Sequence, residues 1–194
     1  MASFDEVLQD VDRRCRDQHV PMLGGEKAKF LADLITQVKP TLIVECGTAI
    51  GYSGLWMART LQTLGSGRII TAELNPERAH AARENFARAG VSHLIDSRIG
   101  DASLVLKTVQ DPVDFLFLDN GYGNYHPCFT AIASRLVDGA TIVADNVGIG
   151  ADAMADYLSH VRGRYESKTH WFDINLPWVK RDAIEVTVYR KSGQ

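Results

Sequence analysis

Short apolar segments that alternate with longer amphipathic ones constrain the fold of this 194-residue chain more than any other feature. The apolar segments predict strands over residues 41–45, 68–73, 94–99, 113–119 and 140–145. The amphipathic segments predict helices over residues 25–38, 53–64, 76–89, 101–109, 124–137 and 150–163. Strands that alternate with helices indicate βαβ units, and hence a parallel sheet with right-handed crossovers.

The C-terminal part of the chain departs from this alternation. Residues 171–174 and 184–190 predict two strands with no helix between them, so we expect an antiparallel pair at one edge of the sheet. No linker, internal repeat or low-complexity tract divides the sequence. We therefore expect a single α/β domain over residues 1–194.

Charge and cysteine content exclude several other classes of protein. Lys and Arg number 21 against 24 Asp and Glu, a net charge of -3, whereas general nucleic-acid binders carry a strong basic excess. The three cysteines are widely spaced and predict neither a zinc site nor a complete disulfide framework. Reduced thiols, together with the lack of a signal peptide or membrane span, lead us to expect a cytoplasmic protein.

Four of the five predicted strands end in an acidic residue, namely Glu45, Glu73, Asp119 and Asp145, and the other strand is followed by Asp101. Carboxylates are disfavoured inside strands, and the carboxyl ends of parallel strands meet at the ligand crevice of an open α/β sheet. Each acid alone is also compatible with a strand terminator or a helix cap. Together they predict a carboxylate-lined site at one edge of the sheet.

The glycine-rich turn over residues 45–54 lies between the first strand and the next helix. Ala49 breaks the dinucleotide pattern G-x-G-x-x-G, and no Gly-Lys-Ser/Thr sequence of a P-loop follows. Glu73, at the end of the second strand, can accept hydrogen bonds from both hydroxyls of a ribose. A nucleoside cofactor without a diphosphate therefore fits better than NAD.

These features, in this order, resemble class I S-adenosylmethionine-dependent methyltransferases. The resemblance rests on residues 43–54, Glu73, 100–102, Asp119 and 145–146, and it covers about residues 20–191. Within the class, the sequence is most similar to the metal-dependent O-methyltransferases typified by the catechol and caffeoyl-CoA enzymes. The resemblance implies a Rossmann-like methyltransferase fold, with a mostly parallel seven-stranded sheet, an antiparallel C-terminal edge and helices on both faces.

The resemblance also implies a cofactor, a metal and a reaction. The positions that hold S-adenosylmethionine in the family correspond to Leu23, Glu45, Gly47, Tyr52, Ser53, Glu73, Asp101, Ala102, Ser103 and Asp119. The metal ligands correspond to Asp119, Asp145 and Asn146, an oxygen set that suits Mg²⁺. The expected reaction is methyl transfer to a hydroxyl of a small catechol-like aromatic, whose pKa the metal lowers.

The predicted catalytic residues are Asp119, Asn146, Glu185 and Tyr122. Glu185 resembles the glutamate of the catechol enzyme that binds the hydroxyl that is not methylated, although an outward acid on an edge strand fits equally well. Tyr122 stands where the family usually has a lysine, and a tyrosine of ordinary pKa is a poor base at pH 7.

Two other functions stay open, the second of them because of the missing lysine. One is methylation of a hydroxylated tRNA base, on which related small methyltransferases act, although the composition argues against a nucleic-acid partner. The other is a catalytically silent protein that binds S-adenosylmethionine. Trp171 and Trp178 fit either an acceptor pocket or the packing of edge strands. No membrane partner is expected, and because the family often dimerises, a homodimer also stays open.

Overall fold

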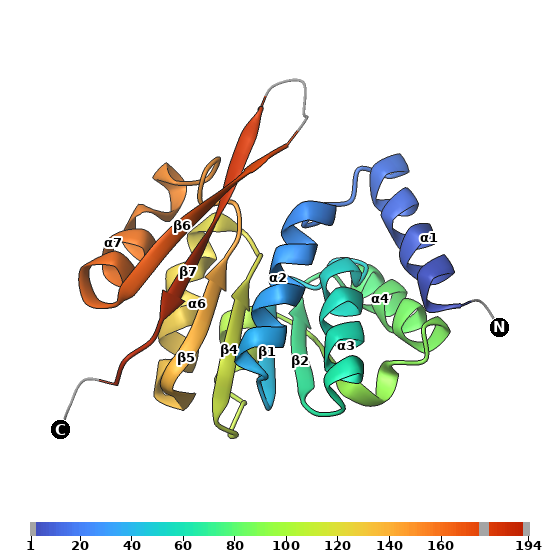
Figure 1. Cartoon of the computed structure of the whole chain (residues 1–194), viewed down its shortest axis with the longest axis horizontal. Helices are drawn as coiled ribbons and strands as arrows, with labels where there is room; N and C mark the ends of the chain where they lie inside the picture. Colours follow the sequence, from blue (N-terminus) through green and yellow to red (C-terminus); the bar gives the residue numbers. More distant parts are fainter. Residues whose placement is uncertain (1–2, 175–178, 192–194) are drawn as a thin grey trace.

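A computed structural model describes residues 3–174 and 179–191 of the chain. Its strands form one seven-stranded sheet in the order β3-β2-β1-β4-β5-β7-β6 (Figure 1). The strands are β1 (Leu42–Cys46), β2 (Arg68–Glu73), β3 (Ile95–Ile99), β4 (Val113–Leu118), β5 (Leu136–Ala144), β6 (Glu166–Asp173) and β7 (Arg181–Val188). The first five are parallel, whereas β7 runs antiparallel to both β5 and β6. The predicted parallel sheet and its antiparallel C-terminal edge are confirmed.

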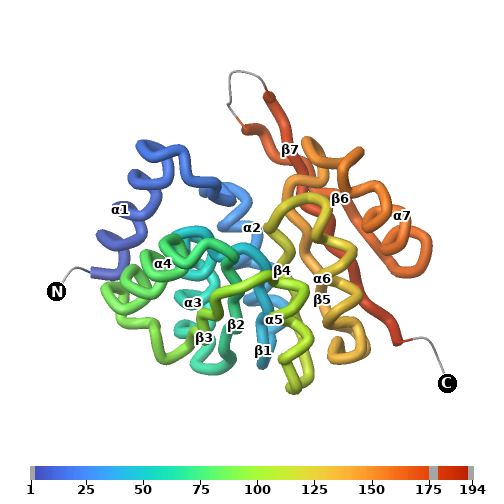
Figure 2. The backbone as a smooth tube through the Cα atoms, turned by 180° about the vertical axis from the view of Figure 1, so that it is seen from behind, coloured from blue at the N-terminus to red at the C-terminus, as the bar shows by residue number. Residues whose placement is uncertain are grey.

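Helices cover both faces of the sheet, as predicted. They are α1 (Phe4–Asp17), α2 (Gly25–Val38), α3 (Tyr52–Leu64), α4 (Pro76–Arg88), α5 (Ala102–Leu106), α6 (Tyr125–Ile132) and α7 (Ala155–Arg164). Figure 1 shows α2 and α3 in front of the sheet, and Figure 2, from behind, shows α5 and α6 over the opposite face. Side chains of the central strands alternate between two cores: Phe115 and Phe117 pack with α1–α4, and Leu116 and Leu118 with α5–α7.

The prediction of a helix over residues 124–137 is wrong at its end. Helix α6 stops at Ile132, a 3₁₀ turn follows over Ala133–Arg135, and β5 already begins at Leu136. Leu136 pairs with Val113 of β4 ahead of a register shift, so this pairing extends the strand to the N-terminal side of its predicted start at residue 140. The predicted helix over 101–109 is likewise too long, because α5 ends at Leu106.

Helix α1 was not predicted, although its N-terminus carries a clear sequence signal. Ser3 and Glu6 form a capping box, in which each side chain accepts a hydrogen bond from the other residue's backbone N–H. Val7 and Val11 are buried against the rest of the α1–α4 face. None of the helices in the described residues combines the length and apolar character needed to cross a membrane.

The order in which the chain adds strands to the sheet reverses between β1 and β4. From β1 the chain builds β2 and β3 on one side, then crosses to β4 and β5 on the other. The connections that leave the carboxyl ends of β1 and β4 therefore separate to opposite faces. This opens a crevice at the sheet edge where the predicted acids lie.

Candidate functional site

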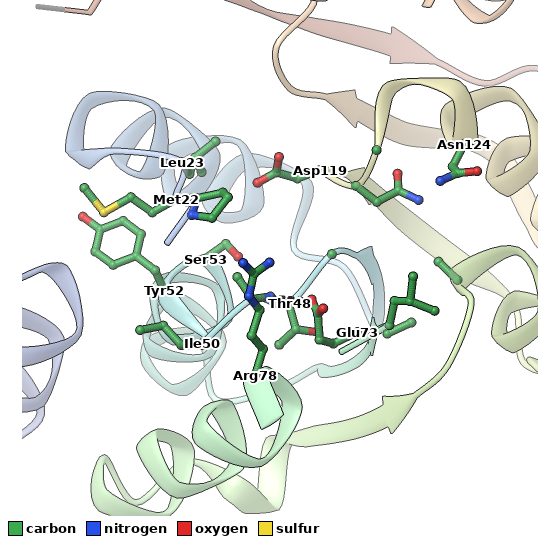
Figure 3. Close-up of a pocket in the computed structure, with 18 of the residues that line it drawn as sticks. Met22, Leu23, Thr48, Ile50, Tyr52, Ser53, Glu73, Arg78, Asp119 and Asn124 are labelled. Carbon is green, nitrogen blue, oxygen red and sulfur yellow. Dashed lines mark hydrogen bonds between the residues drawn. The ribbon is translucent and has the colours of Figure 1, made fainter. Parts of the chain in front are cut away.

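A pocket of about 370 Å³ lies at the carboxyl ends of β1, β2 and β4 (Figure 3). The segment before α2, the turn after β1 and the loops after β2, β3, β4 and β5 all contribute to its lining. The sequence-predicted site residues that line it are Leu23, Gly47, Tyr52, Ser53, Glu73, Asp101, Ala102, Asp119, Tyr122 and Asn146. Four predicted site residues are not among its lining residues: Glu45, Ser103, Asp145 and Glu185.

The turn after β1 passes very close to the chain that leaves β4. Gly47 has φ +98°, and a Cβ built on it would lie 2.1 Å from the carbonyl oxygen of Asp119. Its N–H donates to the carbonyl of Ala72, at 2.9 Å, which ties the turn to β2 as well. Only glycine fits this position, because any side chain would push β1 and β4 apart at the pocket.

Glu73 is held in place by backbone groups on both sides. Its Oε2 accepts the N–H of Ala49 at 2.8 Å, and its Oε1 accepts the N–H of Asn75 at 2.9 Å. Each oxygen retains another acceptor position, so the fixed carboxylate can receive the two hydroxyls of a ribose.

Glu45 lies beneath the pocket instead of lining it. Its carboxylate accepts the hydroxyls of Ser53 and Thr71, each at 2.5 Å, and is fully buried. Burial raises the pKa of Glu45 to about 7, although both hydroxyls favour the ionised form. Glu45 therefore acts through Ser53, whose side chain it orients at the pocket wall.

The pocket's far end, after β3, shows the same division between lining and support. Asp101 lines the pocket, and its Oδ1 accepts the hydroxyl of Ser103 at 2.6 Å. The Ser103 hydroxyl, with help from the backbone N–H of Leu104, lowers the pKa of Asp101. Ser103 thus orients a pocket residue and does not itself line the pocket.

The candidate metal ligands follow β4 and β5. The N–H of Asp145 donates to the carbonyl of Leu118 at 3.0 Å, so the two loops leave the sheet side by side. Burial raises the pKa of Asp119 well above its ordinary value, and repulsion from Asp145 raises it further, whereas Lys27 opposes the shift. Burial also raises the pKa of Asp145, to about 6. This end of the pocket carries more negative charge than its surroundings stabilise.

Lys27 supplies a cation that sequence analysis missed. It lies on α2, its side chain is 4% exposed, and its Nζ is 2.5 Å from both Asp145 Oδ1 and Asp182 Oδ2. Burial lowers the pKa of Lys27, but the two carboxylates outweigh burial and leave the pKa raised. A signal was available: Lys27 occupies the same buried face of α2 as Leu31, where a charged residue needs a partner.

Asp182, on β7, organises the loop that follows β5. Its Oδ1 accepts the N–H groups of Gly148 and Ile149, at 3.2 and 3.0 Å. Its Oδ2 accepts Lys27 and the side-chain amide of Asn146, the latter at 2.9 Å. Because the Asn146 nitrogen donates to Asp182, its amide oxygen is the atom that remains for a ligand.

The chemistry of this set fits a divalent cation. When all three carboxylates are ionised, Asp119, Asp145 and Asp182 against Lys27 leave two uncompensated negative charges. Hard oxygen donors from two carboxylates and an amide are typical of Mg²⁺ sites, which keep several waters. Within the described residues no group of three His, Cys, Asp or Glu side chains could hold a metal, so the amide of Asn146 is needed to complete the set.

Tyr122 lines the pocket after β4, at the position of the missing lysine. Burial raises the pKa of its hydroxyl, and Asp182 and Asp145 add to the rise. The residue therefore keeps its proton at neutral pH, and the positive charge near the carboxylates comes from Lys27 instead.

Glu185 is not among the residues that line the pocket, and its interpretation as an outward acid on an edge strand is wrong. It belongs to β7, which is flanked by β5 and β6, and it is 1% exposed. Arg162 binds both carboxylate oxygens at 2.8 and 2.9 Å, and Ser167 and Thr169 donate to them as well. Burial raises the pKa of Glu185, but these donors outweigh it and leave the pKa lowered.

Trp171 is not among the residues that line the pocket. Trp171 is 53% exposed, and the Arg181 guanidinium lies 5.4 Å from its ring centre. Trp178 lies outside the described residues. Arg78, a residue that sequence analysis did not select for the site, extends from α4 into the pocket (Figure 3).

Comparison with known proteins shows the family to which the sequence is similar. The sequence model of the O-methyltransferase family matches residues 3–156. Catechol O-methyltransferase from Sus scrofa is 31% identical over 188 residues, which cover 92% of this chain and 96% of the pig protein. Catechol O-methyltransferase from Mus musculus is 28% identical over 196 residues, or 96% of this chain and 72% of that protein.

A solved structure extends the likeness to the fold. The O-methyltransferase TomG from Streptomyces achromogenes, in complex with S-adenosylmethionine, has a TM-score of 0.82 and 25% sequence identity, over 96% of this chain and 90% of that one. The chain therefore belongs to the O-methyltransferase family, and it is an S-adenosylmethionine-dependent O-methyltransferase of the catechol O-methyltransferase type.

Proposed function

We propose that the enzyme transfers the methyl group of S-adenosylmethionine to one hydroxyl of a small catechol-like aromatic, with the assistance of Mg²⁺. One observation carries the proposal: Asp119 and Asn146, two of the three candidate metal ligands, line the same pocket as Glu73 and Ser53. An acceptor oxygen bound at the metal end would thus lie next to the cofactor. The names of the relatives support a phenolic acceptor.

The cofactor would extend from Ser53 to Asp101 along the pocket. We assign the methionine part to the turn that contains Gly47 and Ser53, the ribose to Glu73, and the adenine to the segment at Asp101. Leu23 and Tyr52 would close the pocket from the side of α2 and α3. Asp119, which lies near Leu23 in the pocket wall, would contact the methionine part as well as the metal (Figure 3).

Asp119, Asp145 and Asn146 would hold Mg²⁺, which when bound lowers the pKa of a coordinated hydroxyl and fixes its position. The chain's own residues supply the rest. Asp182 accepts a hydrogen bond from the side-chain nitrogen of Asn146, which leaves the Asn146 oxygen to bind the metal. Lys27 forms an ion pair with Asp145 and fixes its position. In the transfer, the acceptor hydroxyl loses its proton to solvent water, an oxygen lone pair forms the bond to the methyl carbon, and the carbon–sulfur electron pair stays on sulfur. Alignment of these three atoms is the main contribution of the protein.

An assay with labelled S-adenosylmethionine, MgCl₂ and catechol tests the proposal. We expect label in the aromatic product, loss of transfer with excess EDTA, and recovery when MgCl₂ is restored. Phenol and resorcinol are matched acceptors, since neither can chelate a metal through two neighbouring oxygens, and we expect both to react far more slowly. Transfer that is indifferent to EDTA would remove the metal from the proposal, and equal rates on all three acceptors would remove the catechol preference.

A further inference from the structure

The arrangement of Lys27 and Asp182 has a consequence for which cation the site accepts. We propose that Lys27 makes the site selective for Mg²⁺ over Ca²⁺, because its ammonium group occupies carboxylate oxygens that a larger cation would use. The inference rests on the proposed function, specifically on the metal site formed by Asp119, Asp145 and Asn146.

Hydrogen bonds within the protein already occupy most of the carboxylate oxygens that could bind a metal at this site. Lys27 Nζ donates a hydrogen bond to Asp145 Oδ1, at 2.5 Å, so only the other carboxylate oxygen of Asp145 remains for a cation. All of Asp182 is engaged, since two N–H groups bind its Oδ1, and Lys27 and Asn146 bind its Oδ2. Of the two carboxylates that Lys27 contacts, one can therefore bind a metal through a single oxygen and the other is withheld.

Mg²⁺ and Ca²⁺ differ in what they require from such a set. Mg²⁺ takes about six ligands at close to octahedral geometry and retains several waters, so one or two protein carboxylates suffice. Ca²⁺ takes about six to eight oxygens and often binds a carboxylate through both oxygens. Without the ammonium group, Asp145 could bind through both oxygens and Asp182 could join the site, which would favour the larger ion.

Because both ions carry the same charge, the ratio of their affinities separates ligand supply from electrostatics. Removal of a lysine makes the site more negative and strengthens the binding of both ions in a similar way. A change in the Ca²⁺ to Mg²⁺ ratio therefore reports a change in the number of available oxygens. This ratio is a readout that a purely structural role of Lys27 would not move.

The experiment uses the whole protein and Mn²⁺ as the probe, with free Mn²⁺ followed by electron paramagnetic resonance while MgCl₂ or CaCl₂ displaces it. We expect Lys27→Met to shift the ratio of affinities toward Ca²⁺ by about tenfold or more, as new oxygen ligands become available. Lys27→Arg, which keeps the charge and the donors, should restore most of the wild-type ratio. Lys29→Met is the matched control, because Lys29 lies on the same helix with an exposed side chain paired to Asp33.

The outcomes separate the inference from the function on which it rests. If Lys27→Met changes both affinities equally, Lys27 does not select the metal, whereas the proposed function stands. If the wild-type protein binds neither Mn²⁺ nor Mg²⁺, the metal part of the proposed function is wrong, and the inference fails with it. Should Lys27→Met fail to fold, as judged by its binding of S-adenosylhomocysteine, Lys27→Gln, which removes the charge but keeps an N–H donor group, must shift the ratio toward Ca²⁺ relative to the wild type, and an unchanged ratio would overturn the inference.

Discussion

The two ends of the pocket stabilise their carboxylates in different ways. At the cofactor end, Glu73 and Glu45 receive neutral donors, namely backbone N–H groups for Glu73 and the hydroxyls of Ser53 and Thr71 for Glu45. At the opposite end, Asp145 and Asp182 share the ammonium group of Lys27. The first end is complete once the chain has folded, whereas the second retains excess negative charge. We infer that folding alone prepares the cofactor end, and that a cation completes the other.

The largest effect is expected from Asp145→Asn, which removes a charge from the incomplete end. The variant weakens the metal site and leaves Lys27 with one carboxylate partner fewer, so we expect the rate of methyl transfer to fall on the order of 10³-fold. S-adenosylhomocysteine affinity should stay near the wild-type value, because Asp145 is not among the residues that line the pocket. Single-turnover rates and calorimetric titration measure the two quantities.

Asp152→Asn is the control for this prediction, since it removes an exposed carboxylate from the same connection between β5 and α7. If Asp145→Asn weakened cofactor binding as much as catalysis, the two ends of the pocket would not be independent, and the comparison above would fail.

The next largest effect concerns Glu45 and pH. Burial raises the pKa of Glu45 to about 7 from an ordinary value of 4.5, so the folded protein holds this proton more tightly than the unfolded chain does. Stability from this group is therefore present below about pH 4.5 and lost as the pH rises toward 7, by on the order of 3 kcal/mol. Glu45→Gln is neutral throughout, and its free energy of unfolding should rise relative to the wild type across this range.

Urea unfolding at pH 4.5, 6 and 7.5 measures the difference, with Glu77→Gln, an exposed acid on α4, as the control. A difference between Glu45→Gln and the wild type that stays constant with pH would show that Glu45 titrates normally in the folded protein. In that case the hydroxyls of Ser53 and Thr71 would compensate its burial fully.

Glu73→Gln should reduce cofactor affinity with less effect on the metal. An amide nitrogen in place of one oxygen would face the N–H of Ala49 or Asn75, both of which are donors, and would lose one acceptor for the ribose. Hydrogen bonds to a charged group contribute about 1.5–3 kcal/mol, so we expect S-adenosylhomocysteine to bind roughly 10- to 100-fold more weakly. Mn²⁺ affinity should not change. Glu84→Gln on the exposed face of α4 is the control, and a parallel loss of Mn²⁺ binding would contradict the separation of the two ends.

Sequence analysis could predict the site residues whose positions follow from the arrangement of the parallel strands. Glu73, Asp101 and Asp119 follow parallel strands, and the carboxyl ends of such strands meet at one edge whatever the details of packing. Lys27 and Asp182 could not be found in this way, because they lie 155 positions apart and meet only when α2 packs beside β7. Burial of a charge is disfavoured unless it is paired, and pairing across such a separation is a property of the tertiary structure.

The same distinction between local sequence signals and tertiary contacts explains which elements of the fold were predicted correctly and which were not. Helix 25–38 was predicted with its observed bounds because its ends are local: Pro40 stops it, and its apolar face has helical period. The end of α6 depends instead on the pairing of Leu136 with Val113, a contact between β5 and β4 that no local pattern records. The interpretation of Glu185 as an outward acid failed for the same reason, since its partner Arg162 comes from α7.

Glu185→Gln should have the smallest effect. It tests whether Glu185 belongs to the pocket or serves only the packing of β6 and β7. Arg162, Ser167 and Thr169 hold this carboxylate within the β6–β7 region, and Gln can keep some but not all of these hydrogen bonds. We expect a loss of about 1 kcal/mol in the free energy of unfolding, with no change in KM for catechol. Steady-state kinetics and urea unfolding measure the pair, and Glu166→Gln, exposed at the start of β6, is the control. A rise in KM without a loss of stability would return Glu185 to the acceptor site and would mean that the substrate-binding state brings β7 closer to the pocket.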